Sequence, residues 1–143
     1  MHMNKRIKNK WLKALRSGKY KQGKSILFSD NKYCCLGVLC ELAVQDGIIK
    51  KSFMYYNTYF DKAVMLLPPK VVKWAGFDKE NVSIESTPRW SAFYRPRRRH
   101  EYNIVIREKT KLKRNITSMI ELPDLNDSGN TFKQIAKVIE KYL

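Results

Sequence analysis

The first sixteen residues combine apolar and basic positions with the repeat of an α-helix. One face carries the large apolar side chains of Ile7, Trp11 and Leu15 at a spacing of four residues, with Leu12 beside them. The other face is almost entirely Lys and Arg. This spacing predicts an amphipathic helix over residues 4–16 with a basic outer face. The pair Ser17 and Gly18 is typical of a helix C-terminus, so we expect the helix to end there.

The most continuous apolar stretch of the chain covers residues 33–44. It can begin as a strand, and from about Leu36 it is predicted to be a buried helix because its apolar residues repeat at helical spacing. Gly37 inside this helix indicates close packing against another backbone. Residues 25–28 are predicted to form a short strand before it, and residues 29–32 a turn.

The middle of the chain is less regular. Residues 52–65 are rich in aromatic side chains, but their periodicity favours neither a helix nor a strand. A short helix is predicted over residues 70–75, because Pro68 and Pro69 precede it and proline is favoured in a first turn. Gly76 is expected to end that helix.

The second half of the chain contains the best candidate strands. Residues 102–106 have the strongest strand pattern, and residues 82–84 a weaker one. Residues 107–120 are expected to turn back and to form a further strand, whose final part is residues 116–120. The segment 86–100 holds two prolines and a run of arginines, so we interpret it as an exposed loop. Two strands flanking a basic turn predict a protruding hairpin.

The C-terminus combines a polar loop with a helix. Residues 126–130 are predicted to be the loop, and Asn130 or Thr131 can cap the helix that follows. That helix carries an apolar stripe at helical spacing: Phe132, Ile135, Ala136, Ile139 and Leu143. The elements together predict an α+β fold. We expect one compact domain over residues 1–143, with helices at both termini, a small antiparallel sheet, and a basic hairpin or loop insertion over residues 86–115.

Charge is concentrated in two segments. The chain has 143 residues, with 29 Lys and Arg against 13 Asp and Glu, and a formal net charge of +16. Residues 1–24 carry nine basic and no acidic residues, and residues 86–115 carry ten basic and two acidic residues. The remainder is close to neutral. Such fields attract nucleic acid, phosphate-bearing small molecules or an acidic protein surface. The alternative is that the charge serves only solubility, but scattered charge would serve that purpose equally well.

Cysteine usage indicates a reducing compartment. Cys34, Cys35 and Cys40 are an odd number clustered within seven residues, and the chain has no distant partner for them. They lack the paired spacing of structural zinc sites, so we expect buried core thiols and no metal or other cofactor. No run of about 18 apolar residues predicts a membrane span. The basic N-terminus also lacks the apolar run of a secretory signal.

Catalytic machinery is not apparent in the sequence. His100 is the only credible histidine, and it lies within the arginine-rich segment. Asp124 and Asp127 are the closest pair of carboxylates, and both have turn or capping roles open to them. The chain has neither a P-loop nor a dinucleotide-binding glycine motif. We therefore expect a binding protein; an enzyme that depends on His100 is the alternative.

Three motifs resemble those of a known family. They are YCCLGVLC at residues 33–40, preceded by WLKALRSG at residues 11–18; LPPKVVKWAG at residues 67–76; and LNDSG at residues 125–129. In this order they resemble a family of small uncharacterised proteins found mainly in bacteriophage and prophage genomes. The resemblance covers most of residues 10–76 and 122–141. It implies a phage accessory protein in the cytoplasm of the host bacterium, and it implies no particular activity. The long basic segment between the last two motifs departs from the family pattern.

The basic segments supply the strongest candidate site. Arginine matches phosphate with two parallel hydrogen bonds, and aromatic faces beside it suit stacking on bases. The predicted phosphate-binding residues of this segment are Arg89, Arg95, Arg97, Arg98, Arg99 and Arg107, with Trp90 and Tyr94 between them. A plain solvated loop is the alternative. The loop of Asn126, Asp127 and Ser128 before a helix is a second candidate phosphate cradle, with ordinary helix capping as its alternative.

Two functions from different classes follow. In the first, the protein binds a phosphate-bearing nucleotide ligand without turnover and so counters a bacterial defence signal, as a homo-oligomer that closes over the ligand. In the second, it binds DNA or RNA without sequence preference, through the N-terminal basic helix and the segment 86–115. A third hypothesis is that the protein inhibits an acidic host protein.

Overall fold

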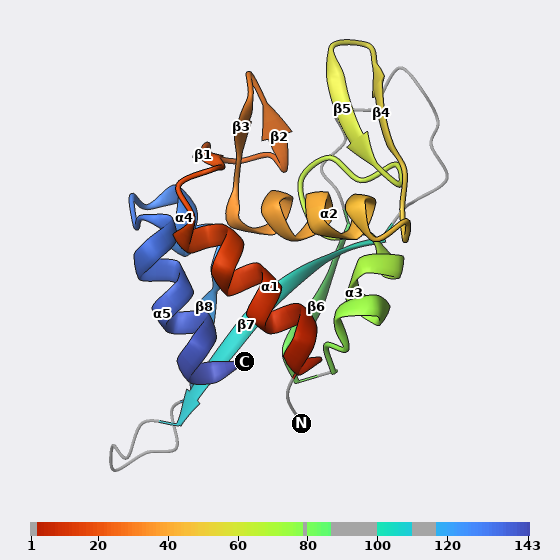
Figure 1. Ribbon diagram of the computed structural model, residues 1–143. Helices are drawn as coiled ribbons and strands as arrows, with labels where there is room; N and C mark the ends of the chain where they lie inside the picture. The colour runs from red at the N-terminus through yellow and green to blue at the C-terminus, as the bar shows by residue number, and fades with distance from the viewer. Residues whose placement is uncertain (1–2, 79, 87–99, 110–116) are drawn as a thin grey trace.

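The computed structural model describes residues 3–78, 80–86, 100–109 and 117–143, and Figure 1 shows their arrangement. Its helices, in chain order, are α1 (Lys5–Arg16), α2 (Cys35–Gln45), α3 (Pro69–Ala75), α4 (Leu122–Asp127) and α5 (Phe132–Tyr142). Its strands are β1 (Lys21–Gln22), β2 (Phe28–Ser29), β3 (Lys32–Tyr33), β4 (Lys51–Met54), β5 (Asn57–Phe60), β6 (Val82–Ser86), β7 (His100–Lys109) and β8 (Thr117–Glu121).

The helices enclose one core in front of a small sheet. α1 packs against α2 and α5, and α3 and α4 pack against β7 (Figure 1). The fully buried Trp11 of α1 forms part of the core, and its indole Nε1 donates a hydrogen bond to the carbonyl oxygen of Cys35 at 3.0 Å. This bond satisfies the polar atom of the largest core side chain, as a buried tryptophan requires.

The sheet that carries the core is antiparallel, with the order β6–β7–β8. In the central strand, Ile104 lies opposite Val82 and Ile106 lies opposite Ile120. Ile104 and Ile106 are both buried. Strand residues two apart share one face, so these two side chains reach the core together. The predicted α+β fold, with helices at both termini and a small antiparallel sheet, is confirmed.

The helices predicted from periodicity are present. α1 and α2 match their predicted ranges within one or two residues, and α3 begins one residue early, at Pro69. Gly76 ends α3 in the left-handed conformation, with φ of 74°. Thr131 caps α5 through a capping box with Gln134. These elements were predictable because caps and apolar stripes are local in sequence.

The strand predicted over residues 25–28 is wrong. Ser25 has a φ of 71°, which no strand residue adopts, and pairing begins only at Phe28 in β2. The buried Leu27 instead donates its backbone N–H to the carbonyl oxygen of Val64 at 2.9 Å. The segment is therefore a loop that inserts one apolar side chain into the core.

The polar loop predicted over residues 126–130 is wrong in its first half. Leu122–Asp127 form α4, so Asn126 and Asp127 occupy the last turn of a helix. The helix has only six residues and carries Pro123 in its first turn, so it shows no apolar periodicity long enough to detect. Ser128 is its C-terminal cap.

The strand pattern at 102–106 extends further than predicted. β7 continues to Lys109, which pairs with Thr117 of β8, because backbone pairing does not depend on side-chain polarity. The predicted hairpin of two antiparallel strands is present as β7 and β8. The segment 86–115 thus includes the central core strand. Its remaining parts, residues 87–99 and 110–115, lie outside the described residues.

The aromatic segment 52–65, for which the sequence favoured no structure, contains a hairpin. β4 and β5 pair antiparallel, and Met54 lies opposite Asn57, so Tyr55 and Tyr56 form a two-residue turn. Across the described ranges, no helix is both long enough and apolar enough to cross a bilayer.

Candidate anion-binding surface

The N-terminal helix presents its basic side chains to solvent. The side-chain oxygen of Asn4 accepts hydrogen bonds from the backbone N–H groups of Arg6 and Ile7, at 3.0 and 3.2 Å, and so begins α1. The inner face is buried in the core. The outer face exposes most of the six basic residues of a helix that has no acidic residue: Lys5, Arg6, Lys8, Lys10, Lys13 and Arg16.

α5 extends this basic surface from the other end of the chain. The two helices pack side by side (Figure 1), and α5 contributes exposed Lys133, Lys137 and Lys141. Glu140, the single acidic residue of the two helices, lies at the seam. Its carboxylate pairs with Arg16, and its backbone oxygen accepts a hydrogen bond from Lys8 Nζ at 3.1 Å. We call the exposed basic side chains of these two helices the α1–α5 face.

Acidic residues neutralise only part of the α1–α5 face. The hydrogen bond from Arg16 lowers the pKa of Glu140, so this carboxylate stays charged. Asp46, after α2, lies 3.1 Å from Lys10 and 4.0 Å from Arg6. Lys13 and Lys137 are exposed and make no ion pair with another described residue. The face therefore keeps a net positive field, which is weakly screened close to the surface.

The predicted phosphate cradle at the end of α4 is occupied by the protein's own groups. Asn126 is fully buried. Its Oδ1 accepts from Cys35 N and from Gln22 Nε2, both at 3.1 Å, and its Nδ2 donates to the carbonyl oxygen of Gly23 at 2.7 Å and to Asp127 Oδ1 at 3.2 Å. Its side-chain hydrogen-bonding capacity is fully used.

The neighbours of Asn126 also hold the fold together. Asp127 Oδ1 accepts the backbone N–H of Ser25 at 2.9 Å. This bond connects α4 to residues 23–32, the segment that runs from the end of β1 to the start of β3 and includes β2, which we call the 23–32 loop. Gln22 Oε1 accepts the backbone N–H of Phe132 at 3.0 Å, at the N-terminus of α5. The exposed Ser128 donates its hydroxyl to the carbonyl oxygen of Leu125 at 3.2 Å. The predicted cradle is thus a structural junction, and sequence reasoning missed Gln22 because its partners are about a hundred residues away.

The predicted arginine and aromatic site falls largely outside the described residues. Its members there are Arg89, Arg95, Arg97, Arg98, Arg99, Trp90 and Tyr94. Arg107 lies in β7, where its backbone is in register with Met119 of β8.

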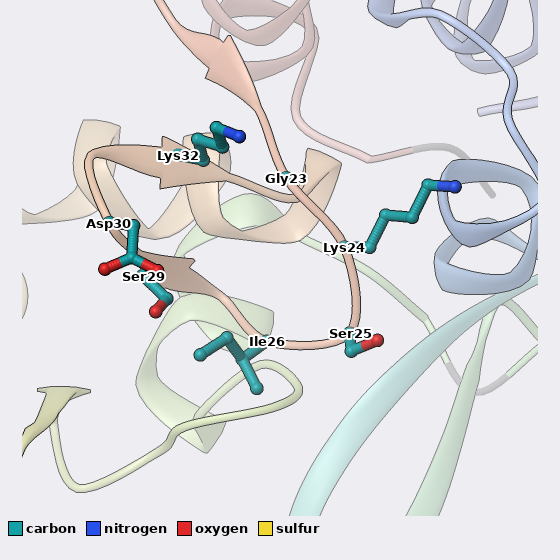
Figure 2. A pocket seen from close by; sticks show the side chains of 7 residues that line it. All are labelled: Gly23, Lys24, Ser25, Ile26, Ser29, Asp30 and Lys32. Carbon is teal, nitrogen blue, oxygen red and sulfur yellow. The ribbon is translucent and has the colours of Figure 1, made fainter.

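A small pocket lies beside the junction. It has a volume of about 310 Å³ and is lined by Gly23, Lys24, Ser25, Ile26, Ser29, Asp30 and Lys32. Figure 2 shows Lys24 and Asp30 leaving the loop on opposite sides. The lining thus combines two ammonium groups and two hydroxyls with one carboxylate that would oppose an anion. Its volume is at the lower end of the range for small-molecule sites, about 300–1,000 Å³.

The three cysteines are free and buried, as predicted. Burial raises the pKa of Cys34 to about 11 and raises the pKa of Cys35 and Cys40 well above the usual range. Such thiols are uncharged and poor nucleophiles. Cys34 Sγ instead accepts the backbone N–H of Gly37 at 3.4 Å and caps α2. Among the described residues, no group of three His, Cys, Asp or Glu side chains could hold a metal ion.

Glu101 is a buried carboxyl that the sequence did not single out. It is 4% exposed, and its Oε1 accepts the backbone N–H of Val64 at 2.8 Å. Its Oε2 is buried without a hydrogen-bond partner among the described residues. Burial raises the pKa of Glu101, and the bond from Val64 partly offsets the rise. Glu101 thus fixes the 63–67 segment beside β7.

Comparison with protein families assigns the chain to one of them. Residues 3–143 match the family described as a domain of unknown function, DUF8296. Because the match covers nearly the whole chain, the protein belongs to this family. Comparisons with curated proteins and with solved structures gave no significant match.

Proposed function

We propose that the protein binds the phosphate backbone of nucleic acid, without turnover and without sequence preference, through the α1–α5 face. The observation that carries the proposal is the juxtaposition of two basic helices from opposite ends of the chain. Sequence reasoning weighed only the first of them.

The dimensions of α1 suit a phosphate backbone. A helix of twelve residues is about 18 Å long, and duplex DNA carries one negative charge per roughly 1.7 Å of its axis. Six basic residues on one such helix, with three more on its neighbour, can therefore contact several phosphates at once. Most basic residues of the face are lysines spread over two helices, which fits an extended polyanion better than a small ligand.

The structural roles of the motif residues also favour this function. The argument for a small nucleotide ligand was that the distinctive motifs lie in the neutral body and imply a specific site there. Gly37, Cys34 and Asn126, however, serve packing, capping and the junction of α4 with the 23–32 loop. The roles of these three residues in folding support the view that the ligand binds on the surface of the protein.

Fluorescence anisotropy with a labelled DNA duplex, titrated at several salt concentrations, tests the proposal. The variant Lys13→Gln with Lys137→Gln removes two charges from the α1–α5 face. If both contact phosphates, the slope of log affinity against log salt should fall by about 2. The matched control is Lys70→Gln with Lys73→Gln, which removes two exposed charges from α3.

The control separates a binding face from general charge. We expect the α3 variant to keep nearly the wild-type slope and affinity, since its lysines belong to neither helix of the α1–α5 face. Equal weakening by both variants would mean that only net charge matters. A wild-type protein that binds neither duplex nor single-stranded DNA at low salt would refute the proposal.

The pocket beside the junction supports a second candidate, in which a phage-encoded protein binds a phosphate-bearing nucleotide and so counters a bacterial defence signal. Lys24, Lys32 and the hydroxyls of Ser25 and Ser29 could contact a phosphate there. Native mass spectrometry of protein purified from infected cells tests this candidate. A phosphate-bearing small molecule should co-purify with the wild type and be lost from Lys24→Gln with Lys32→Gln. Absence of any bound molecule in the wild type counts against it.

A further inference from the structure

The β4–β5 hairpin exposes an unusual concentration of aromatic surface. Phe53, Tyr55 and Tyr56 are 71%, 63% and 96% exposed, and Met54 beside them is 54% exposed. Figure 1 shows the hairpin projecting from the body beyond α2. Large apolar side chains gathered on a protruding tip are commonly interaction sites, whereas singly scattered ones need no explanation.

The turn at the tip is built from residues that do not suit it. Tyr55 and Tyr56 both have positive φ, 50° and 66°, as the central residues of a type I′ turn do. Asn-Gly is strongly preferred at these two positions, and bulky side chains there are strained. Folding alone would therefore be better served by another sequence. Strained residues that persist at an exposed tip indicate that the side chains are used for binding.

The base of the hairpin is firmly anchored, so the tip is held in place. Phe60 at the end of β5 is fully buried. Lys51 Nζ at the start of β4 lies 2.8 Å from Glu41 Oε2 and 5.1 Å from the centre of the Phe28 ring. The backbone N–H of Asp61 donates to Lys50 O at 2.9 Å. These contacts come from α2, β2 and the hairpin itself and fix the orientation of its aromatic end.

The charges around the hairpin suit an anionic partner. Lys50 and Lys62 are exposed at its base, and Asp61 is the single acidic residue between residues 48 and 62. Exposed aromatic rings at the tip of a hairpin, with lysines at its base, suit single-stranded nucleic acid, which presents both bases and phosphates along its length. The rings stack on unpaired bases and the ammonium groups contact phosphates. An apolar protein groove would use the rings but gain nothing from the lysines.

We propose that the β4–β5 tip stacks on unpaired bases, so that the preferred ligand of this protein is single-stranded DNA or RNA. This inference rests on the proposed function, because the α1–α5 face supplies the general attraction to phosphate. The tip then distinguishes single strands, whose bases are accessible, from duplexes, whose bases are already stacked.

The test uses the double substitution Tyr55→Asn with Tyr56→Gly in the full chain. It places the preferred turn residues at the tip, so the hairpin should fold at least as well and the melting temperature should not fall. Affinity for a labelled single-stranded oligonucleotide should fall about tenfold or more, since each lost base stack weakens binding by about that factor. Affinity for duplex should stay within about twofold of the wild type.

Two controls make the outcomes distinct. Tyr55→Phe with Tyr56→Phe keeps the rings and should keep single-strand binding, whereas Lys13→Gln with Lys137→Gln should weaken binding to both forms. If the variant Tyr55→Asn with Tyr56→Gly binds single strands as the wild type does, the stacking role is wrong, but the proposed binding of phosphate by the α1–α5 face is not affected. The tip would then be a protein-docking element. If the wild type binds neither form, the proposed function itself fails.

Discussion

Gly37 of α2 lies directly against the backbone of Leu27. A Cβ atom at Gly37 would be 1.8 Å from the carbonyl oxygen of Leu27 and 2.7 Å from its carbonyl carbon. The Leu27 segment is held on both sides, since its N–H donates to Val64 O and its carbonyl oxygen accepts from Cys34 N. The glycine therefore sets how closely the 23–32 loop approaches the buried helix. The sequence predicted this close packing, and the structure confirms it and identifies the partner.

The substitution Gly37→Ala should destabilise the protein by about 3 kcal/mol or more, because neither the helix nor the anchored loop can move without breaking other contacts. The direction of the change in stability is informative. In an unhindered helix the same change would stabilise by about 1 kcal/mol through helix propensity. Urea unfolding monitored by circular dichroism measures the difference.

Gly18→Ala is the matched comparison for Gly37→Ala. Gly18 has a φ of 74°, and a Cβ atom added there would meet nothing within 4 Å, so only backbone strain opposes the change. We expect a loss of about 1 kcal/mol. A loss at Gly37 no larger than that at Gly18 would contradict the contact with Leu27.

Asn126→Asp should destabilise the fold by about 3 kcal/mol or more at pH 7. The change replaces the amide nitrogen that donates to Gly23 O and to Asp127 Oδ1 by an acceptor oxygen, in a fully buried position. The loss should shrink toward pH 4, where the new carboxyl can be protonated and donate. Urea unfolding of Ser128→Ala, which should stay within about 0.5 kcal/mol of wild type, shows that the effect belongs to the junction and not to the motif as a whole.

Glu140→Gln should strengthen binding to nucleic acid. The substitution removes the only acidic side chain of α1 and α5 and releases Arg16 from its ion pair. Anisotropy titrations should show a higher affinity and a steeper salt dependence than the wild type, with little change in the unfolding midpoint, because an exposed pair contributes little to stability. Unchanged affinity would indicate that phosphate binds elsewhere on the protein.

Glu101 should make stability depend on pH. Burial raises its pKa in the folded state, so the folded protein holds the proton more tightly than the unfolded chain, whose Glu pKa is about 4.3. The resulting stabilisation is complete below the unfolded pKa and is lost as the pH rises through the folded pKa. The wild type should therefore lose stability relative to Glu101→Gln between pH 4 and pH 7 in urea unfolding. A difference that is constant over this range would be evidence against the raised pKa.

The thiols should be unreactive in the folded protein. Cys34, Cys35 and Cys40 are buried, and the pKa of Cys34 is about 11, so little thiolate forms at pH 8. Ellman's reagent should label three thiols rapidly in urea and react in native buffer only as fast as the protein opens. Rapid labelling of any thiol in native buffer would show that α2 is less protected than the structure indicates.

Sequence reasoning was most successful where the signal is local. Thr131 and Gly76 lie at helix ends, where a cap depends on residues a few positions away. It failed at Ser25 and at α4. Leu27 looks like a strand residue in its local context, and only its bonds to Val64 and Cys34 make the segment a loop.

The candidate site also combines features that are local in sequence with features that depend on long-range contacts. The basic outer face of α1 and the buried thiols follow from composition and helical spacing, so the order of amino acids was enough to predict them. Long-range contacts were needed to establish that α5 lies beside α1, that Asn126 holds the 23–32 loop, and that Tyr55 and Tyr56 form an exposed tip. Each of these depends on which distant segments come together or on how the backbone turns at two residues. A helical repeat or a charge count carries no information about either.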